Sequence, residues 1–118
     1  PPLPYRLFND YYVMITPKSR KIHSIWAISN FQNNAKCIAE LDVLKGLLEQ
    51  KYGAFEQTLI SMNRSYSFRT QDRSIIIKCD DNFSSATMYA MYDDSEIGKL
   101  ANQEYIEIEK QNNDTRGL

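Results

Sequence analysis

The chain has 118 residues, of which 42% are hydrophobic and 25% are charged, and its formal net charge is −1. This length fits one domain and is too short for two separate cores, and the composition excludes an intrinsically disordered chain. No apolar run approaches the roughly 20 residues of a membrane-spanning helix, so the sequence predicts no transmembrane segment.

The charges are unevenly distributed along the chain. Residues 1–30 and 61–79 are basic, whereas residues 80–118 hold nine acidic residues against three basic ones. We interpret this as complementarity between parts of one molecule, and electrostatic steering of a partner is the alternative.

The N-terminal third predicts an arm followed by a β-hairpin. Residues 1–10 are rich in proline and apolar side chains, which favours an extended arm laid over the domain. Residues 11–15 are β-branched and aromatic and predict a strand. A polar turn with Pro17 leads to a second strand over residues 22–29, which is expected to be central because both its faces are partly apolar.

A long amphipathic helix is predicted next. Asn33 or Asn34 is placed to cap its N-terminus, and Gly53 follows its last residue, Tyr52, where a left-handed cap belongs. Apolar residues recur between these caps at spacings of three and four, with charged residues on the other side.

The second half of the chain predicts further strands. Residues 57–63 and 66–70 give weak strand signals, with residues 64–73 as a hairpin. Residues 74–79 are a strong strand, and residues 86–92 form the last one.

Asp93 and Glu96 form a capping box that opens a second helix. The predicted order is ββαβββα, an α+β fold in which an antiparallel sheet carries two amphipathic helices packed on one side. We expect a single domain over residues 11–110, preceded by the arm of residues 1–10 and followed by a flexible tail of residues 111–118. The chain starts at Pro1 without a methionine, which suggests a mature or trimmed form.

Two cysteines are separated by 42 positions, at Cys37 in the first turn of the helix and Cys79 at the end of a core strand. A helix that packs on this strand would bring them together, and a bridge would contribute about 4 kcal/mol by the chain-entropy estimate. Two buried free thiols in a cytosolic protein are the alternative, because cysteine is among the most buried residues. A disulfide would imply an oxidising compartment.

The residues suited to catalysis or metal binding do not converge in the sequence. His23 is the only histidine, and nothing places it near Cys37 or Cys79 as the base of a cysteine nucleophile. The acidic pairs at 80–81 and 93–94 lack the spacing of a calcium loop and fit a turn and a helix cap. We therefore predict no catalytic residues, no metal and no cofactor.

One segment interleaves cations with aromatic residues, as proteins that bind single-stranded nucleic acid do. A hairpin with aromatic residues inward and arginines outward produces the same string, and the slightly acidic chain makes nucleic acid an unlikely partner. The aromatic arm is a second candidate surface, because tyrosine is favoured at protein interfaces. The candidate partner surface comprises Tyr5, Phe8, Arg64, Tyr66, Arg69 and Arg73.

A set of segments spread over most of the chain carries a resemblance to a known group of proteins. They are residues 12–19, 21–27, Asn34, Cys37, 40–41, 48–53, 75–79, Tyr92, Asp94, 100–101, Glu104 and 117–118. Together they resemble small, uncharacterised exported proteins of Gram-negative bacteria that carry a signal peptide or lipoprotein leader. The resemblance implies a periplasmic or exported setting and favours the Cys37–Cys79 bridge, and it leaves open whether a leader or lipid anchor precedes residue 1. It implies no active site.

The first functional hypothesis is a non-catalytic binding or interaction module of the bacterial envelope that holds another protein. The alternative is a small cytoplasmic protein associated with nucleic acid or a prophage, with Arg64, Arg69 and Arg73 as its contacts. A small hydrolase ranks last, because the single histidine and the scattered acids make no convincing constellation.

Overall fold

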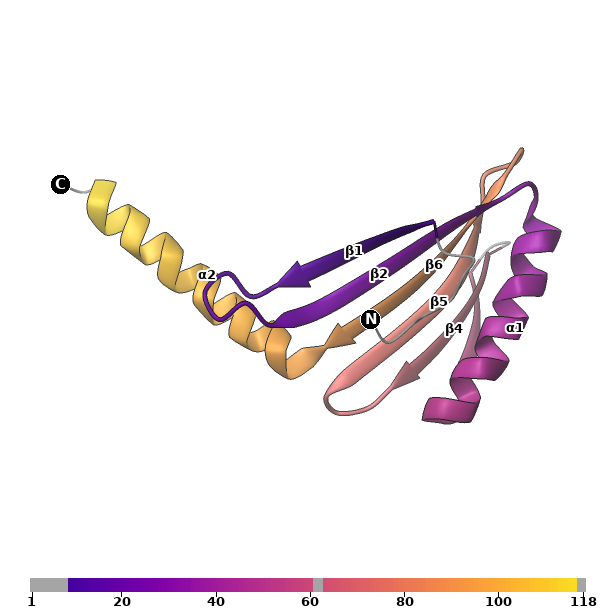
Figure 1. Ribbon diagram of the computed structural model, residues 1–118, viewed down its shortest axis with the longest axis horizontal. Helices are drawn as coiled ribbons and strands as arrows, with labels where there is room; N and C mark the ends of the chain where they lie inside the picture. The colour runs from indigo at the N-terminus through magenta and orange to yellow at the C-terminus, as the bar shows by residue number, and fades with distance from the viewer. Residues whose placement is uncertain (1–8, 61–62, 117–118) are drawn as a thin grey trace.

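The computed structural model describes residues 9–60 and 63–116, which form one antiparallel sheet and two helices (Figure 1). The strand order across the sheet is β1-β2-β6-β5-β4-β3, so β1 and β3 are its edges. The elements are β1 (Asp10–Ile15), β2 (Ile22–Phe31), α1 (Asn34–Tyr52), β3 (Glu56–Ile60), β4 (Asn63–Arg69), β5 (Arg73–Asp81), β6 (Ala86–Asp94) and α2 (Ser95–Arg116).

The α+β class and the antiparallel sheet are confirmed, but the order is ββαββββα, with one strand more than predicted. The additional strand arises because β3 and β4 pair as two separate strands. Their sequences contain many polar residues, so the alternation that marks a strand is weak there. β4 is held by its hydrogen-bonded ladder with β5, and β3 by its ladder with β4.

The ends of α1 match the caps that the sequence predicts. The Asn33 side chain accepts a hydrogen bond of 2.9 Å from the Lys36 N–H, and the Gly53 N–H donates to the Glu49 carbonyl at 3.0 Å. Gly53 has φ of 123°, a conformation that side chains with a Cβ rarely adopt. The inner face of the helix buries Cys37, Leu41, Leu44 and Leu48.

The core lies between α1 and the middle of the sheet. Alternate residues of β2, β4, β5 and β6 face the helix. The register aligns Ala27, Ala90 and Ile77 side by side across β2, β6 and β5. All three residues are fully buried. The two alanines are small, so the helix can approach the strands closely. The remaining core residues are Phe55, Tyr66, Ile75, Cys79, Ala86 and Met88.

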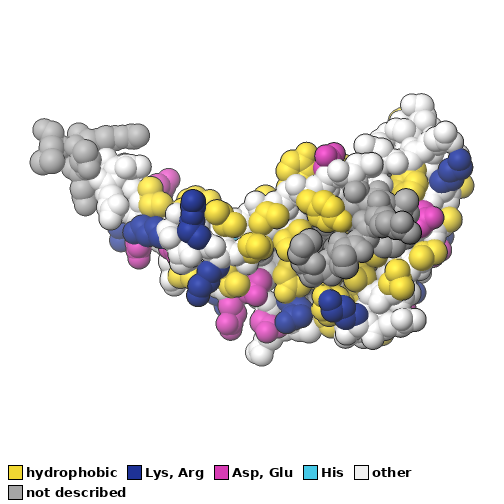
Figure 2. Space-filling model, in the orientation of Figure 1, with side chains coloured by type: hydrophobic (Ala, Val, Ile, Leu, Met, Phe, Trp, Pro, Cys, Tyr) yellow, Lys and Arg dark blue, Asp and Glu magenta, His cyan; other side chains and the backbone are white. Residues whose placement is uncertain are grey.

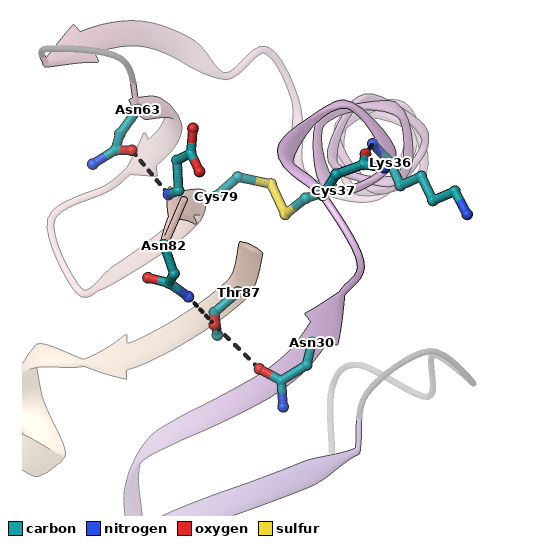
Figure 3. Close-up of a disulfide and its surroundings, with 9 residues drawn as sticks. Asn30, Lys36, Cys37, Asn63, Cys79, Asn82 and Thr87 are labelled. Atoms are coloured by element: carbon teal, nitrogen blue, oxygen red, sulfur yellow. Dashed lines mark hydrogen bonds between the residues drawn. A yellow bond between two sulfur atoms is a disulfide. The ribbon is translucent and has the colours of Figure 1, made fainter. Parts of the chain in front are cut away.

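A disulfide joins Cys37 in the first turn of α1 to Cys79 in β5, as the sequence and the resemblance led us to expect (Figure 3). The two Cα atoms are 6.1 Å apart, and both side chains are fully buried. On the neighbouring strands, the Thr87 hydroxyl donates to Asn30 at 3.1 Å and accepts from the Asn82 amide at 3.0 Å. The bridge therefore attaches the start of α1 to the end of the sheet where Thr87 hydrogen-bonds Asn30 and Asn82.

The second helix differs from the prediction in its cap and in its position. The side chain that accepts the Ile97 N–H is Asp94, at 2.9 Å, whereas Asp93 belongs to β6. α2 does not lie over the sheet beside α1; it continues from β6 past the end of the strands (Figure 1). Ala101 is buried near the strand ends, and residues 105–113 are mostly exposed.

The helix continues to Arg116, so residues 111–116, which we expected in a C-terminal tail, are helical. The expected arm of residues 1–10 lies outside the described residues except for its last two. Asn9 donates its N–H to the Ile28 carbonyl at 2.9 Å, and Asp10 begins β1. Among residues 9–60 and 63–116, neither helix has the length and apolar character needed to cross a membrane.

Replacing both cysteines, Cys37→Ala with Cys79→Ala, should lower the free energy of unfolding by up to about 4 kcal/mol, because the open chain regains the entropy of a long loop. Urea denaturation of the variant and of the oxidised wild type measures the difference. The fold should persist in the variant, because α1 keeps its buried leucines. A variant as stable as the oxidised protein would contradict a structural role for the bridge.

Candidate functional site

The most exposed apolar element of the described structure is the edge strand β1. All six of its residues are exposed, and five of them in succession are large and apolar, with exposed fractions from 36% to 55%. Among the described strands, only β2 pairs with it. We define the edge surface as Tyr11, Tyr12, Val13, Met14 and Ile15.

The side chains of β1 project from both faces of the sheet. Tyr11 and Val13 stand opposite the buried Ala27 and Ile25 of β2, on the same face as α1. The helix packs mainly over β5 and β6 and lies away from β1 (Figure 1). Within residues 9–60 and 63–116, no helix therefore covers either face of the edge strand as α1 covers the middle of the sheet.

On the other face, apolar side chains continue from β1 across three more strands. Tyr12 is opposite Trp26, Trp26 is opposite Met91, and Met91 is opposite Ile76. Beyond Tyr12 the members of this row are half-buried. Figure 2 shows hydrophobic side chains over the region where β1 and β2 lie in Figure 1. We call Tyr12, Trp26, Met91 and Ile76 the apolar row.

The opposite edge of the sheet has different chemistry. The side chains of Glu56, Gln57 and Thr58 in β3 are exposed and polar. A charged residue on an edge strand discourages pairing with another chain. β1 has its one charge, Asp10, at its first residue, so its central part has no such protection.

A buried carboxylate holds the end of the β1–β2 hairpin against α2. Glu104 is only 6% exposed and accepts the N–H groups of Lys18 and Ser19 at 2.6 and 2.9 Å and the Ser19 hydroxyl at 2.7 Å. One helical turn later, Glu107 pairs with the Lys18 ammonium at 2.8 Å. These contacts confirm, for Lys18, the expected complementarity between the basic hairpin and the acidic C-terminal part.

The hydrogen bonds also decide the protonation state of Glu104. Desolvation raises the pKa of this carboxyl, but the hydrogen bonds from Ser19 and Lys18 and the charge of Lys18 outweigh it, so its pKa is lowered. Inside the turn, the buried Thr16 hydroxyl accepts the Lys21 N–H at 2.8 Å. The Glu104 cluster, which we define as Thr16, Lys18, Ser19 and Glu104, thus holds the turn after β1 through hydrogen bonds.

The described arginines and aromatic residues that the sequence suggested as a partner surface do not all lie together. Arg64 is 3.4 Å from the carboxylate of Asp42, and Arg69 lies at the other end of β4, about 17 Å away at the usual rise of a strand. Arg69 and Arg73 instead line a pocket of about 220 Å³ beside the β4–β5 turn. Tyr5 and Phe8 lie outside the described residues.

Tyr66 belongs to the core rather than to the surface. It is 4% exposed, and its hydroxyl donates to Asp42 at 2.8 Å. Burial raises the pKa of this phenol, and the hydrogen bond to Asp42 raises it further. The segment that interleaves arginines with aromatic residues is thus the strand β4, and the ring of Tyr66 points into the core.

The described residues contain no converging set of reactive groups. His23 is near the start of β2, whereas the register places Cys79 level with Ser29, about 20 Å along the strands. Both cysteines are in the disulfide. In the described part of the chain, no three His, Cys, Asp or Glu side chains gather in a way that could hold a metal ion.

Comparisons with known proteins add no assignment. No family model matches the chain, and no match was found among curated proteins or solved structures. The edge surface and the Glu104 cluster therefore stand on their own geometry. The cluster was missed in the sequence because a carboxylate and a turn 85 residues apart share no local pattern.

Glu104→Gln should destabilise the protein at neutral pH and remove part of its acid sensitivity. Because folding lowers the pKa of Glu104 from its ordinary value of 4.5, the carboxylate stabilises the fold above that pH, and this contribution is lost as the pH falls through the lowered value. The difference between wild type and variant should therefore be largest near pH 7 and shrink below about pH 4. Thermal or urea unfolding across this range measures it.

Glu107→Gln is the matched control, because it removes an exposed ion pair of the same turn and should cost at most about 1 kcal/mol. Equal losses for the two variants at every pH would contradict the assigned role of Glu104.

Proposed function

We propose that this chain is a non-catalytic protein-binding module of the bacterial envelope or another exported compartment. The observation that carries the proposal is the exposure of five consecutive apolar residues, Tyr11 to Ile15, on the edge strand β1. Large apolar patches are rare on proteins that act alone, and an unprotected edge is a template for another strand.

The proposed mode of binding is addition of a strand to the open edge of β1. The backbone N–H and C=O groups along an edge supply affinity, and side chains on the two faces supply specificity. Val13 on one face and Met14 on the other offer apolar contacts to alternate residues of an added segment. The apolar row extends the second of these surfaces inward from Tyr12.

A protein partner fits this surface better than a nucleic acid does. Tyr11 to Ile15 carry no positive charge, and phosphate backbones are bound mainly through lysine and arginine. The proposed nucleic-acid contacts are separated, with Arg64 paired to Asp42 at one end of β4. The edge surface therefore favours an extended, apolar polypeptide segment.

The exported setting is supported by the disulfide and by the resemblance to exported proteins of Gram-negative bacteria. Disulfides persist in the periplasm and outside the cell and are rare in the cytosol. Full burial of Cys37 and Cys79 and their place between helix and sheet favour a structural bridge over a reactive pair.

Binding at β1 can be tested by selecting peptides of about twelve residues from a random displayed library on the folded wild-type protein. The enriched peptides should be rich in β-branched and aromatic residues, and they should lose affinity for Val13→Lys, which places a charge in the middle of the edge. Thr58→Lys makes the same change on the β3 edge and should retain binding. Peptides that bind Val13→Lys as tightly as wild type would place the site elsewhere.

The compartment has its own test. Protein taken from cells in the presence of a thiol-blocking reagent should contain no blocked cysteine by mass spectrometry, because an exported chain carries Cys37 and Cys79 as a disulfide. Addition of two blocking groups, one at each cysteine, would contradict the exported setting and leave the binding mode at β1 to be judged by peptide selection.

A further inference from the structure

We infer that the segment that pairs with β1 is β1 of a second copy of this chain, joined antiparallel across a twofold axis. This inference rests on the proposed function, since it names the partner of the same edge. It starts from the composition of the strand: from Tyr11 to Ile15 every residue is apolar, so any antiparallel self-pairing sets apolar side chains opposite apolar side chains.

Symmetry restricts how two such strands can pair. An isologous antiparallel pair has its axis perpendicular to the sheet, so both copies keep their α1 faces on the same side. In an antiparallel pair, residues directly opposite each other project from the same face of the sheet. Two copies of β1 can meet this condition only if one residue lies on the axis and is opposite the same residue of the other copy. Central pairing leaves two registers, with Tyr12 or Val13 on the axis.

The register with Val13 on the axis agrees better with the side chains. It sets Tyr12 opposite Met14 and Tyr11 opposite Ile15, so all pairs are apolar. The register with Tyr12 on the axis would set the carboxylate of Asp10 opposite Met14 and the polar Asn9 opposite Ile15. An unpaired charge against an apolar side chain is disfavoured, so the geometry points to Val13.

Charge complementarity supports the same arrangement. With Val13 on the axis, Asp10 of one copy is opposite Thr16 of the other, where the chain enters the turn that carries Arg20 and Lys21. Both of these basic side chains belong to exposed residues. Opposite charges thus lie at the same end of the paired strands, which favours this direction and register more than it adds affinity.

The apolar row gains a continuation in the dimer. Tyr12 and Met14 share the face that α1 does not cover, and the axis places Tyr12 of each copy beside Met14 of the other. The two rows, each running from Tyr12 through Trp26 to Met91, then meet at the centre of one continuous sheet. Because the β3 edges carry Glu56, the association closes at two copies rather than continuing into a fibre.

Sedimentation over a range of concentrations tests the second copy. The wild type should change from a monomer of 13.8 kDa to a species of twice that mass. Val13→Lys should raise the dissociation constant of this dimer roughly tenfold or more, because two like charges would face each other on the axis. Thr58→Lys, on the other edge, should leave it unchanged. A wild type that stays monomeric up to millimolar concentration would overturn the inference.

Single cysteines test the register, since only the residue on the axis faces itself. Under mild oxidation Val13→Cys should form a disulfide-linked dimer, whereas Tyr12→Cys and Met14→Cys should do so only when the two variants are mixed. The native bridge is fully buried and stays intact. Efficient cross-linking of Tyr12→Cys alone would overturn the Val13 register.

The two proposals fail in different ways. If the wild type is monomeric but selected peptides bind it and not Val13→Lys, the edge binds a segment of another protein and only the second copy is refuted. If Val13→Lys changes neither association nor peptide binding, β1 is not an interface and both proposals fail.

Discussion

The width of one helix decides which part of this sheet is covered. Six strands spaced about 4.8 Å apart span about 24 Å, whereas an α-helix with its side chains is about 10–12 Å across. α1 packs over β5 and β6, with lesser contact to β2 and β4, and the core forms beneath it. With α2 directed past the strand ends, nothing in the described structure covers β1 in the same way (Figure 1).

The path of the chain then determines that β1 lies at an edge of the described sheet. After β2 the chain crosses by α1 to the far edge and returns as four antiparallel strands, so that β6 closes against β2. Among the strands that the structure describes, β1 pairs with β2. Its position depends on the β2 ladder and on the hydrogen bonds of Glu104 to the turn that follows it.

The two ends of the molecule are thus held by different chemistry. At one end, the Cys37–Cys79 bridge and the apolar core fix α1 to the sheet. At the other, a buried carboxylate with its hydrogen bonds joins α2 to the hairpin. Such a contact is directional, and it is made to the turn rather than to the apolar side chains of β1.

Local signals explain what could be predicted from the chain. Asn33 and Gly53 bracket α1 because capping depends on a few neighbouring residues, and Ile75 and Ile77 mark β5 by β-branched alternation. The signals for β3 and β4 were weak and left them out of the predicted order as two separate strands, because their many polar residues are ordered by pairing, β4 with β5 and β3 with β4. Placing the cap at Asp93 was wrong by one residue, since the end of β6 and not the local motif sets where α2 begins.

By itself the sequence determined the kinds of element, most of their limits and the pair of residues available for a disulfide. It also showed that residues 11–15 form an apolar strand, but such a pattern is the same for a strand in the core and for one at an edge. Only the tertiary structure decided that this strand is exposed and that Glu104 meets Ser19. Exposure and long-range hydrogen bonds depend on the path of the whole chain, which no short window of residues contains.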